Sequence, residues 1–385
     1  MSNFFTDKEI NLLKKAKENK NHIHIKNNSN RNRNVMSVKD LNNLISMHNI
    51  WDQNNFNMVI DKKPINFNKF STKGDEYGFS RTGPDPKKVQ YYIKKGASLV
   101  LNDIIYYSKD IKNIAYDLQK ITSGKCQANL YFSMENRQAF GPHFDTHDVF
   151  ALHCDGEKTW NVYETLADNP INHPIFKPNL EERTKAAGKI IDQVYMKPGD
   201  ILYLPRGKYH DALASESGAI HIAFGIVYVK PIDIIQLVWD ELIINPFLRS
   251  DLREIKEKKD LIEINNKISE EVENLFKSER LLNPIMEFLK NWSYKFEEYN
   301  LMDVVKDGVN FEVSNVVTLR RENNNLILKG SKNSVKVPDE YKALTEFSFE
   351  KKLISTKMLK EHFPNLPQST ILKFIESMKE MRIFI

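Results

Sequence analysis

Cysteine is scarce in this chain of 385 residues. Only Cys126 and Cys154 occur, and they do not form the close-spaced pair of a zinc or disulfide motif. The scarcity argues against a disulfide framework and suits a reducing compartment. The sequence also lacks an uncharged apolar run near the roughly 20 residues that span a bilayer, and its first residues carry charges where a signal peptide needs an apolar core. We therefore expect a cytoplasmic protein with no membrane partner.

A strong charge of either sign is absent as well. The net charge is +5, and a content of 41% hydrophobic and 28% charged residues is typical of a soluble globular protein. Lys and Arg outnumber Asp and Glu nine to four in residues 1–40, which we interpret as a solvated surface. A charge this mild does not require a nucleic-acid partner. The length predicts two or three domains, and no repeat of solenoid period is visible.

Residues 1–228 combine helical and strand patterns. Two helices are predicted over 6–19 and 37–48, and they begin with the capping residues Thr6 and Ser37. From residue 125 onward, short apolar runs are bounded by Gly, Pro, Asp or Asn. These runs predict six strands, over 126–133, 148–154, 158–164, 192–197, 200–205 and 219–229. Six short strands with no long helix among them indicate a barrel or a double-sheet jelly roll.

The rest of the chain is predicted to form two further regions. Apolar residues at three- and four-residue spacing predict helices between 231 and 299. Residues 301–385 combine short strand patterns with two helices, over 355–363 and 368–381. We therefore divide the chain into 1–228, 229–300 and 301–385.

Histidine is concentrated in the strand region. The segment GPHFDTHDVFALHCDGEKTWNVYE (141–164) holds three of the ten histidines and two His-x-Asp pairs, His143 with Asp145 and His153 with Asp155. Further on, the Pro-Arg-Gly turn at 205–207 ends a predicted core strand, and His210 follows this turn. A histidine in this position can face the interior of a barrel. Two imidazoles and one carboxylate form the facial triad that binds Fe(II) and leaves coordination positions open. His210 and one His-x-Asp pair would complete such a triad.

The choice between the two pairs rests on local geometry. Asp155-Gly156 is a two-residue hairpin signal, so the sequence predicts that Asp155 is a turn residue. His143 and Asp145 follow a Gly-Pro pair and precede a strand, at a bend where ligands can converge. We therefore favour His143, Asp145 and His210 as the catalytic metal ligands.

The same predicted hairpin bears on Lys158. With Asp155 and Gly156 at the centre of the turn, His153 pairs with Lys158 and both side chains lie on one face. If that face is the interior, Lys158 is a cation suited to the distal carboxylate of a dicarboxylic cosubstrate. If it is the outer face, Lys158 is an ordinary solvent-facing lysine, and the alternation of side chains does not decide between the two.

Three stretches of the sequence together resemble a known family. They are NLYFSMENRQAFGPHFDTHDVFALHCDGEKTWNVYE, KPGDILYLPRGKYHDA and AIHIAFGI. They look like the JmjC-type cupin of the ribosomal oxygenases, in particular the bacterial ribosomal-protein arginine hydroxylases, which are Fe(II)- and 2-oxoglutarate-dependent. The resemblance covers essentially the whole chain. It implies an α+β fold with a double-stranded β-helix (jelly roll) in 1–228, a helical dimerisation region in 229–300 and a winged-helix-like domain in 301–385.

The resemblance also implies roles for single residues. It makes His143, Asp145 and His210 the ligands of Fe(II), and it makes Lys158 the partner of the 2-oxoglutarate carboxylate. Asn129 and Tyr131 are implied to lie on the strand that lines the cosubstrate pocket. O2 is the second cosubstrate. Arg206, His147, His153 and His221 are candidates for contact with the substrate or with the ligands.

The sequence departs from the family at several positions. His153 stands where these enzymes more often have Gln, and Ala223 where a hydroxyl residue is common. Residues 133–140 replace a Thr-Pro-rich stretch. The iron and cosubstrate residues remain in place, whereas a carry-over of the family's ribosomal-protein substrates is weakened.

Three functions remain open. The leading hypothesis is hydroxylation of a side chain in a protein or peptide, with ribosomal proteins among the candidates. The second keeps this chemistry on a small molecule, a tRNA base or a ribosomally made natural-product peptide. The third is a non-catalytic cupin sensor joined to a winged-helix regulator, which the complete triad and Lys158 disfavour because a sensor needs no open iron face.

Two further expectations concern partners. Residues 231–248 carry more large apolar residues than one helix face buries within a single chain, which predicts a homodimer. The last predicted helix mixes Lys373 and Lys379 with Glu376 and Glu380, whereas a helix that enters a DNA groove needs a more one-sided charge. We therefore expect the C-terminal region to recognise a protein or to be structural, and we do not expect nucleic-acid binding.

Overall fold

The structure, a computed structural model, divides the chain into two compact units, Met1–Phe296 and Glu297–Ile385. It describes residues 4–27, 35–73, 82–134, 140–252, 255–296, 310–323, 325–330 and 333–385. The predicted strand region and the predicted helical region lie together in the first unit. No helix in these ranges is long and apolar enough to cross a membrane.

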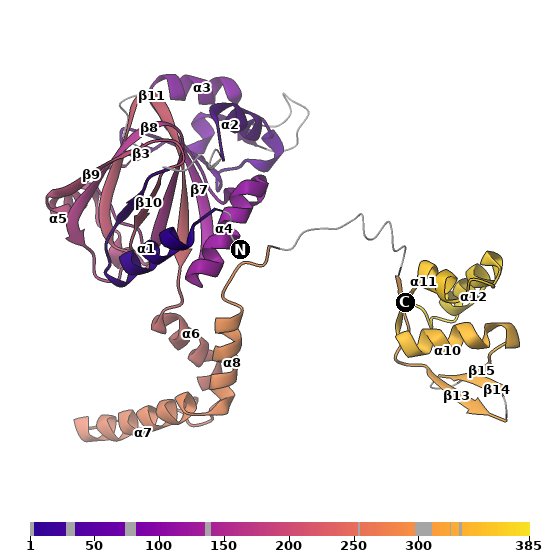
Figure 1. Ribbon diagram of the computed structural model, residues 1–385. Helices are drawn as coiled ribbons and strands as arrows, with labels where there is room; N and C mark the ends of the chain where they lie inside the picture. The colour runs from indigo at the N-terminus through magenta and orange to yellow at the C-terminus, as the bar shows by residue number, and fades with distance from the viewer. Residues whose placement is uncertain are drawn as a thin grey trace. The chain divides into compact units, whose positions relative to one another are not determined.

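The first unit is built around a nine-stranded sheet that folds as a jelly roll (Figure 1). Its strands are β1 (Ile23–Ile25), β2 (Phe56–Ile60), β3 (Lys63–Pro64), β6 (Ser98–Leu101), β7 (Lys125–Ser133), β8 (Asp148–Leu166), β9 (Ile190–Met196), β10 (Ile201–Leu204) and β11 (Lys208–Val227). The two long strands, β8 and β11, are antiparallel neighbours. The first half of β8 also pairs with β10, and its second half pairs with β9. The β8–β11 ribbon thus runs through both halves of the roll.

The predicted hairpin at Asp155-Gly156 is wrong. The strands predicted over 148–154 and 158–164 are one continuous strand, β8. Gly156 has a φ of 67°, and a Cβ there would lie 1.9 Å from the carbonyl oxygen of Gly218 on β11. The β8–β11 register shifts around this point, so the Asp-Gly pair marks an irregularity of the β-bulge type inside the ribbon. The carboxylate of Asp155 accepts a hydrogen bond from the N–H of Val38 at 3.0 Å.

This irregularity changes which residues of β8 face the inside of the roll. Before Gly156, Val149 and Ala151 belong to the inner core, and after it Trp160 and Val162 do. The side chains of β8 that face the inside of the roll therefore lie at odd residue numbers before the bulge and at even numbers after it. The change occurs because a bulge adds an unpaired residue, which interrupts the alternation of side chains between the two faces of the strand. The side chain of Lys158 consequently faces the inside of the roll. The predicted hairpin, which was the basis for considering this orientation, is not present.

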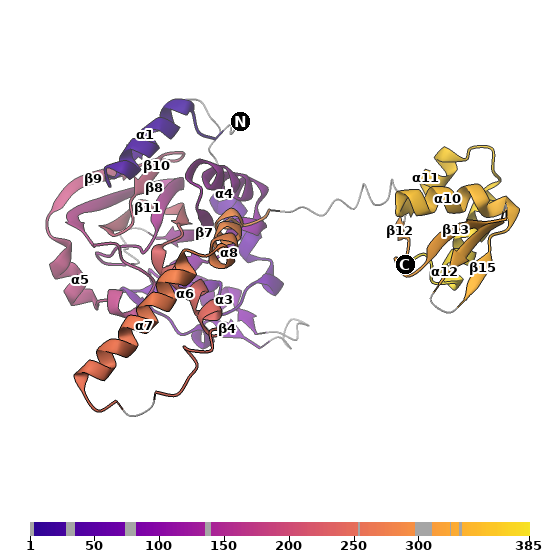
Figure 2. The ribbon, with the colours of Figure 1, turned by 90° about the horizontal axis from the view of Figure 1, so that it is seen from below.

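The predicted N-terminal helices are confirmed. Helix α1 (Asp7–Glu18) begins after Thr6, and α2 (Val38–Ile45) begins after Ser37. Each cap forms the reciprocal capping box, in which the cap side chain and the third helical residue bind each other's backbone N–H. Helix α1 lies beside β10 at the edge where β1 adds to the sheet (Figure 2). Helices α3 (Pro86–Lys94), α4 (Lys109–Thr122) and α5 (Leu180–Ala187) complete this part of the unit.

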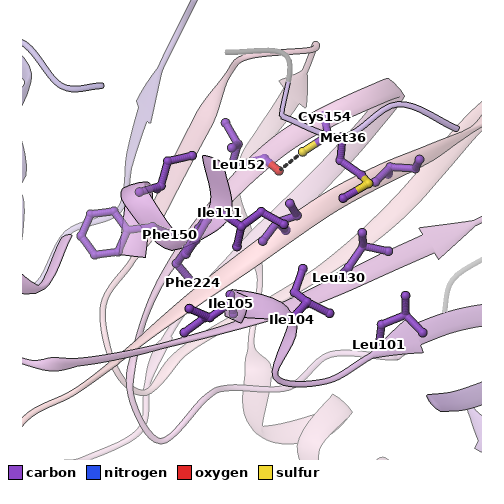
Figure 3. Close-up of a cluster of buried hydrophobic side chains, with 14 of the residues drawn as sticks. Met36, Leu101, Ile104, Ile105, Ile111, Leu130, Phe150, Leu152, Cys154 and Phe224 are labelled. Atoms are coloured by element: carbon purple, nitrogen blue, oxygen red, sulfur yellow. Dashed lines mark hydrogen bonds between the residues drawn. The ribbon is translucent and has the colours of Figure 1, made fainter. Parts of the chain in front are cut away.

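A large apolar core joins the sheet to α4 and to the short 3-10 helix η4 (Ile104–Tyr107) (Figure 3). Ile111 of α4 and Ile104 of η4 lie with Leu130, Phe150 and Phe224 of the sheet in this core. Burial of each large apolar side chain contributes about 1.5–3 kcal/mol to folding. This packing holds the strands that carry the candidate site.

The helical region follows β11. It consists of α6 (Pro231–Leu242), α7 (Lys258–Phe276) and α8 (Glu279–Lys290). The indole N–H of Trp292 donates to the carbonyl of Val227 at 2.9 Å, and Tyr294 exchanges two backbone hydrogen bonds with the side chain of Gln119 on α4. These bonds tie the end of the helical region back to the jelly roll.

The second unit is a small α+β fold with its own core. Its elements are β12 (Asn310–Glu312), β13 (Thr318–Glu322), β14 (Asn325–Lys329), β15 (Ser334–Lys336), α10 (Lys342–Lys351), β16 (Leu353–Ser355), α11 (Thr356–His362) and α12 (Gln368–Glu380). Strands β13, β14 and β15 form a three-stranded sheet, and β12 pairs with β16. Helices α11 and α12 match the predicted ranges, whereas α10 was not predicted.

Candidate metal centre and its cavity

Three potential metal ligands converge at the start of β11. One ligand atom from each of His143, Asp145 and His210 lies within 4.8 Å of the other two. His143 and His210 form a two-residue antiparallel bridge, in which each backbone N–H donates to the other residue's carbonyl at 3.0 and 2.8 Å. The carbonyl of Asp145 accepts from the N–H of Gly207 at 3.0 Å. These backbone bonds hold the His-x-Asp segment against the strand that carries His210.

The hydrogen bonds of the two imidazoles orient their free nitrogens. Nδ1 of His143 lies 2.9 Å from the carbonyl of Gly141, and Nδ1 of His210 lies 2.8 Å from the carbonyl of Lys208. A carbonyl only accepts, so each Nδ1 carries the proton and each Nε2 keeps a lone pair. Backbone carbonyls orient metal-binding histidines in this way. Nε2 of His210 is 3.5 Å from the Asp145 carboxylate.

Burial sets the protonation state of this group. Burial lowers the pKa of His210 to about 4, with the neighbouring His143 acting in the same direction. The ring is therefore neutral near pH 7, as a metal ligand must be. Burial alone would raise the pKa of the Asp145 carboxyl, but the surrounding histidines outweigh it and the net pKa is lowered. Asp145 is thus an anion at neutral pH.

The three residues line a cavity of about 300 Å³ inside the roll. Its other lining residues are Tyr131, Phe140, Val149, Lys158, Trp160, Arg183, Ala212, His221 and Ala223. Polar and charged groups thus share the wall with apolar ones. Such a mixture is typical of a ligand site, in which a few polar groups orient a ligand within an apolar enclosure.

Lys158 is the most deeply buried cation of the cavity, with 3% of its surface exposed. Its Nζ lies 3.4 Å from the Ser133 hydroxyl and 3.3 Å from Nδ1 of His221. No carboxylate of the described residues pairs with it, and burial lowers its pKa to about 7. A buried ammonium without a counter-ion is costly, and an incoming carboxylate would provide one.

Tyr131 and Asn129 occupy β7 opposite β11. Tyr131 lines the cavity, and its ring stacks on His221 with centroids 4.8 Å apart. Burial raises the pKa of the Tyr131 phenol, and the charge of Asp145 adds to the rise. Asn129 does not line the cavity, and its side-chain oxygen accepts from the N–H of Asp103 at 3.1 Å. The side chains of Asn129 and Tyr131, two residues apart on β7, are hydrogen-bonded to each other, so Asn129 contributes to the position of the Tyr131 phenol.

The remaining sequence candidates lie in different places. His221 and Ala223 line the cavity. His153 does not, and its Nε2 hydrogen-bonds to the carbonyl of Gly156 at 3.0 Å. Arg206 lines a separate hollow and donates to the side chain of Asn169 at 2.7 Å.

His147 packs against Gly225 of β11, where a Cβ would lie 2.5 Å from its Nε2. Residues 135–139, which carry most of the segment that departs from the family pattern, lie outside the described residues.

Five of the described lining residues were not predicted from the sequence: Phe140, Val149, Trp160, Arg183 and Ala212. Trp160 lies between the rings of His210 and His221, with centroids 5.7 and 5.1 Å away. Its indole N–H is buried, and none of the described residues accepts from it. Arg183 comes from α5, a helix that local capping signals could have located but whose contact with the cavity depends on the fold.

The comparisons with known proteins agree with this architecture. Residues 105–233 match the family model of the JmjC domain, which confirms the JmjC part of the resemblance over this range. Two curated relatives are the bifunctional lysine-specific demethylase and histidyl-hydroxylase NO66 of Drosophila simulans and of Drosophila melanogaster, 31% and 32% identical over 143 residues. The matches cover 37% of this chain and only 16% and 21% of the relatives. The chain thus matches about a fifth or less of each relative's length.

A solved structure supports the fold independently. The X-ray structure of ycfD from E. coli is similar with a TM-score of 0.51 at 18% sequence identity. The match covers 87% of this chain and 88% of that one. At this level of identity the likeness establishes the fold alone.

Proposed function

From its JmjC domain, we propose that this protein is an Fe(II)- and 2-oxoglutarate-dependent oxygenase that hydroxylates a side chain of a protein or peptide. One observation carries the proposal: two imidazoles, a carboxylate and a buried lysine with no carboxylate partner among the described residues line the same cavity. Neither a structural zinc site nor an ordinary core requires this combination. The name of the NO66 relatives, which includes a histidyl-hydroxylase, supports oxygenase chemistry on a polypeptide.

The donor set fits a divalent iron. His143, Asp145 and His210 supply two imidazole nitrogens and one carboxylate oxygen. This is the ligand set of non-haem Fe(II) oxygenases, and it leaves coordination positions open on one side. The Asp145 ligand is an anion and the His210 ring is neutral at neutral pH, so neither has to lose a proton before the metal binds. The fit rests on the chemistry of these donors.

The cavity also fits 2-oxoglutarate. Lys158 offers a buried ammonium to the distal carboxylate, and the Tyr131 hydroxyl lies in the same wall. Val149, Ala212 and Ala223 give the cavity apolar walls that limit water. Iron(II) supplies the oxidising chemistry that couples decarboxylation of 2-oxoglutarate to insertion of oxygen into a C–H bond. In the balanced reaction, one oxygen atom of O2 enters the substrate and the other enters succinate, with release of CO2.

The helical region supports a homodimer. Ile232, Ile235, Trp239 and Ile243 of α6 and its following turn are each 47% or more exposed, while Val238 is buried. On α8, Leu282, Met286 and Leu289 are exposed as well. An apolar surface of this extent is typical of an interaction site, and a second copy of the chain would cover it.

For the second unit we propose a winged-helix fold that does not bind duplex DNA. The succession of α10, β16, α11 and α12 with the sheet β13-β14-β15 supports the fold. On α12, Lys373 and Lys379 are exposed beside the exposed Glu376 and Glu380. The exposed face of α12 therefore offers phosphate groups no uniform positive charge.

The test is oxidation of peptides by the purified protein. It is incubated with Fe(II), 2-oxoglutarate and a proteome-derived peptide mixture, and products one oxygen atom heavier are located by mass spectrometry. His143→Ala serves as the inactive control. We expect oxidised peptides with stoichiometric succinate, and a much slower reaction of the free target amino acid, because contacts remote from the C–H help to place it. Equal turnover of the free amino acid would shift the proposal to a small-molecule substrate.

A further inference from the structure

Arg183 brings a second positive charge to the cavity from outside the sheet. It belongs to α5 (Leu180–Ala187), which lies between β8 and β9 in the sequence and at the outer end of β9 in space (Figure 1). Of the described lining residues, it is the only one that neither belongs to a strand of the roll nor lies in the 140–145 segment. Its position therefore depends on how α5 is held.

Helix α5 is anchored at both ends. At its start, the side chains of Asn179 and Glu182 form a capping box. The side chain of Leu180 packs against Gly141, where a Cβ would lie 2.7 Å from its Cδ1. At its end, Ala187 is fully buried and the Glu164 carboxylate of β8 accepts from the N–H of Lys189 at 3.1 Å. Arg183 is thus presented to the cavity by a fixed helix next to the His-x-Asp segment.

Within the described residues, the Nε of Arg183 is buried and has no hydrogen-bond partner. The side chain as a whole is half-buried, and its charge acts on the neighbouring phenol of Tyr209, which is not an anion. The acidic side chains of its surroundings are engaged elsewhere, since Glu182 caps the helix and Glu164 binds the backbone of Lys189. A buried charged donor without an acceptor costs roughly 1–3 kcal/mol or more. Such a cost is offset when a ligand supplies the acceptor.

The charges that line the cavity indicate that the ligand of Arg183 is the substrate. Among the described lining residues, Lys158 and Arg183 are cations and Asp145 is an anion, so two positive charges and one negative charge leave a net +1. A divalent iron and the dianion 2-oxoglutarate cancel each other. The cavity therefore keeps a net charge of +1 after iron and 2-oxoglutarate have bound. Because Lys158 pairs with the distal carboxylate of 2-oxoglutarate, the guanidinium of Arg183 is available to the substrate.

We propose that Arg183 is a specificity residue: its guanidinium binds a carboxylate or amide oxygen of the substrate beside the target carbon and excludes a cationic target side chain. The proposal rests on the proposed oxygenase function and narrows its substrate class. The oxygen comes either from an Asp, Asn, Glu or Gln target or from the backbone carbonyl next to a neutral target. An arginine or lysine target would place two cations side by side in a poorly solvated cavity.

The experiment compares the wild-type protein with Arg183→Met, Arg183→Lys and the matched control Lys185→Met. Lys185 is exposed on the same helix, so its replacement removes an equal charge outside the cavity. Three quantities are measured: metal content, the KM for 2-oxoglutarate from succinate formed without substrate, and the identity and KM of peptides oxidised in a proteome-derived mixture. The first two report on the oxygenase machinery, and the third reports on Arg183.

We expect wild-type products at acidic, amide or neutral residues. Arg183→Met should raise the KM for the peptide about 10- to 150-fold, the equivalent of a lost charge-assisted hydrogen bond. Its metal content and KM for 2-oxoglutarate should not change. Arg183→Lys should restore part of the affinity, and Lys185→Met should resemble the wild type. Products at Asp, Asn, Glu or Gln would identify a side-chain oxygen, and products at other neutral residues a backbone carbonyl.

Several results would overturn the inference. Oxidation of arginine or lysine residues would do so, and so would an unchanged peptide KM in Arg183→Met. A raised KM for 2-oxoglutarate in that variant would assign Arg183 to the cosubstrate instead. Succinate formation without any oxidised peptide of the expected classes would also count against it. Wild-type protein that binds metal but consumes no 2-oxoglutarate would refute the oxygenase function itself, and the inference with it.

Discussion

Replacement of Lys158 by Met should separate cosubstrate binding from metal binding. The ammonium of Lys158 is buried, and its neighbours within hydrogen-bond distance are Ser133 and His221, neither of which is an anion. A carboxylate that enters the cavity becomes its counter-ion. Methionine is an unbranched side chain one atom shorter than lysine and carries no charge, so we expect the metal ligands to keep their positions.

The expected size of the effect follows from the burial of this contact. A hydrogen bond to a charged group contributes about 1.5–3 kcal/mol, which corresponds to a rise of about 10- to 150-fold in the KM for 2-oxoglutarate. Succinate formation at varied 2-oxoglutarate measures this KM, and equilibrium dialysis with Mn(II) measures metal content. Lys197→Met is the matched control, because Lys197 is exposed and follows Met196, the cross-strand partner of Lys158.

The same variant should change the pH dependence. Burial lowers the pKa of Lys158 to about 7, so in the ligand-free protein the amine loses its proton as the pH rises through that value. The carboxylate binds the protonated form. The wild-type KM for 2-oxoglutarate should therefore rise above pH 7, by up to about tenfold per pH unit, and the KM of Lys158→Met should not follow this rise. An unchanged KM together with an unchanged pH profile in Lys158→Met would refute the assignment.

Three other predictions concern the metal, the bulge and the dimer. His143→Ala or Asp145→Ala should lose the single bound Mn(II) or Fe(II), because the two remaining ligands hold the ion poorly. His153→Ala should keep the metal. Metal content measured by dialysis that shows the opposite pattern would contradict the choice of ligands. Gly156→Ala should lower the free energy of unfolding by at least about 1–3 kcal/mol, since the residue has positive φ and its Cβ would overlap the Gly218 carbonyl. Gly83→Ala, where the Cβ meets nothing nearer than 3.6 Å, is the control in urea unfolding, and equal effects of the two substitutions would contradict the role of the bulge. Sedimentation should give twice the chain mass of 45.0 kDa, and Trp239→Glu should yield the monomer while Ile175→Glu does not; a wild-type monomer at tens of micromolar would rule out the dimer.

Much of the local structure was predictable because its signals are local. Thr6 and Ser37 cap their helices through hydrogen bonds to residues three positions away, so the sequence alone locates both starts. The runs that form β7, β9 and β10 are bounded by turn residues that break pairing on either side. Asp155-Gly156 is the instructive error. Glycine with positive φ serves a turn and a bulge equally well, and only the pairing of β8 with β11 decides between them.

The chemical types at the candidate site were also determined by the sequence, since two imidazoles and a carboxylate at this spacing are typical of a facial triad. Their convergence was decided by the tertiary structure, through the backbone bridge between His143 and His210. The direction of Lys158 was decided by the bulge at Gly156, which moves the inward-facing set of β8 by one residue. The presence of Arg183 was decided by the docking of α5 beside Gly141. Each of these depends on contacts between residues distant in the chain, and the alternation and capping signals of a sequence extend over only a few positions.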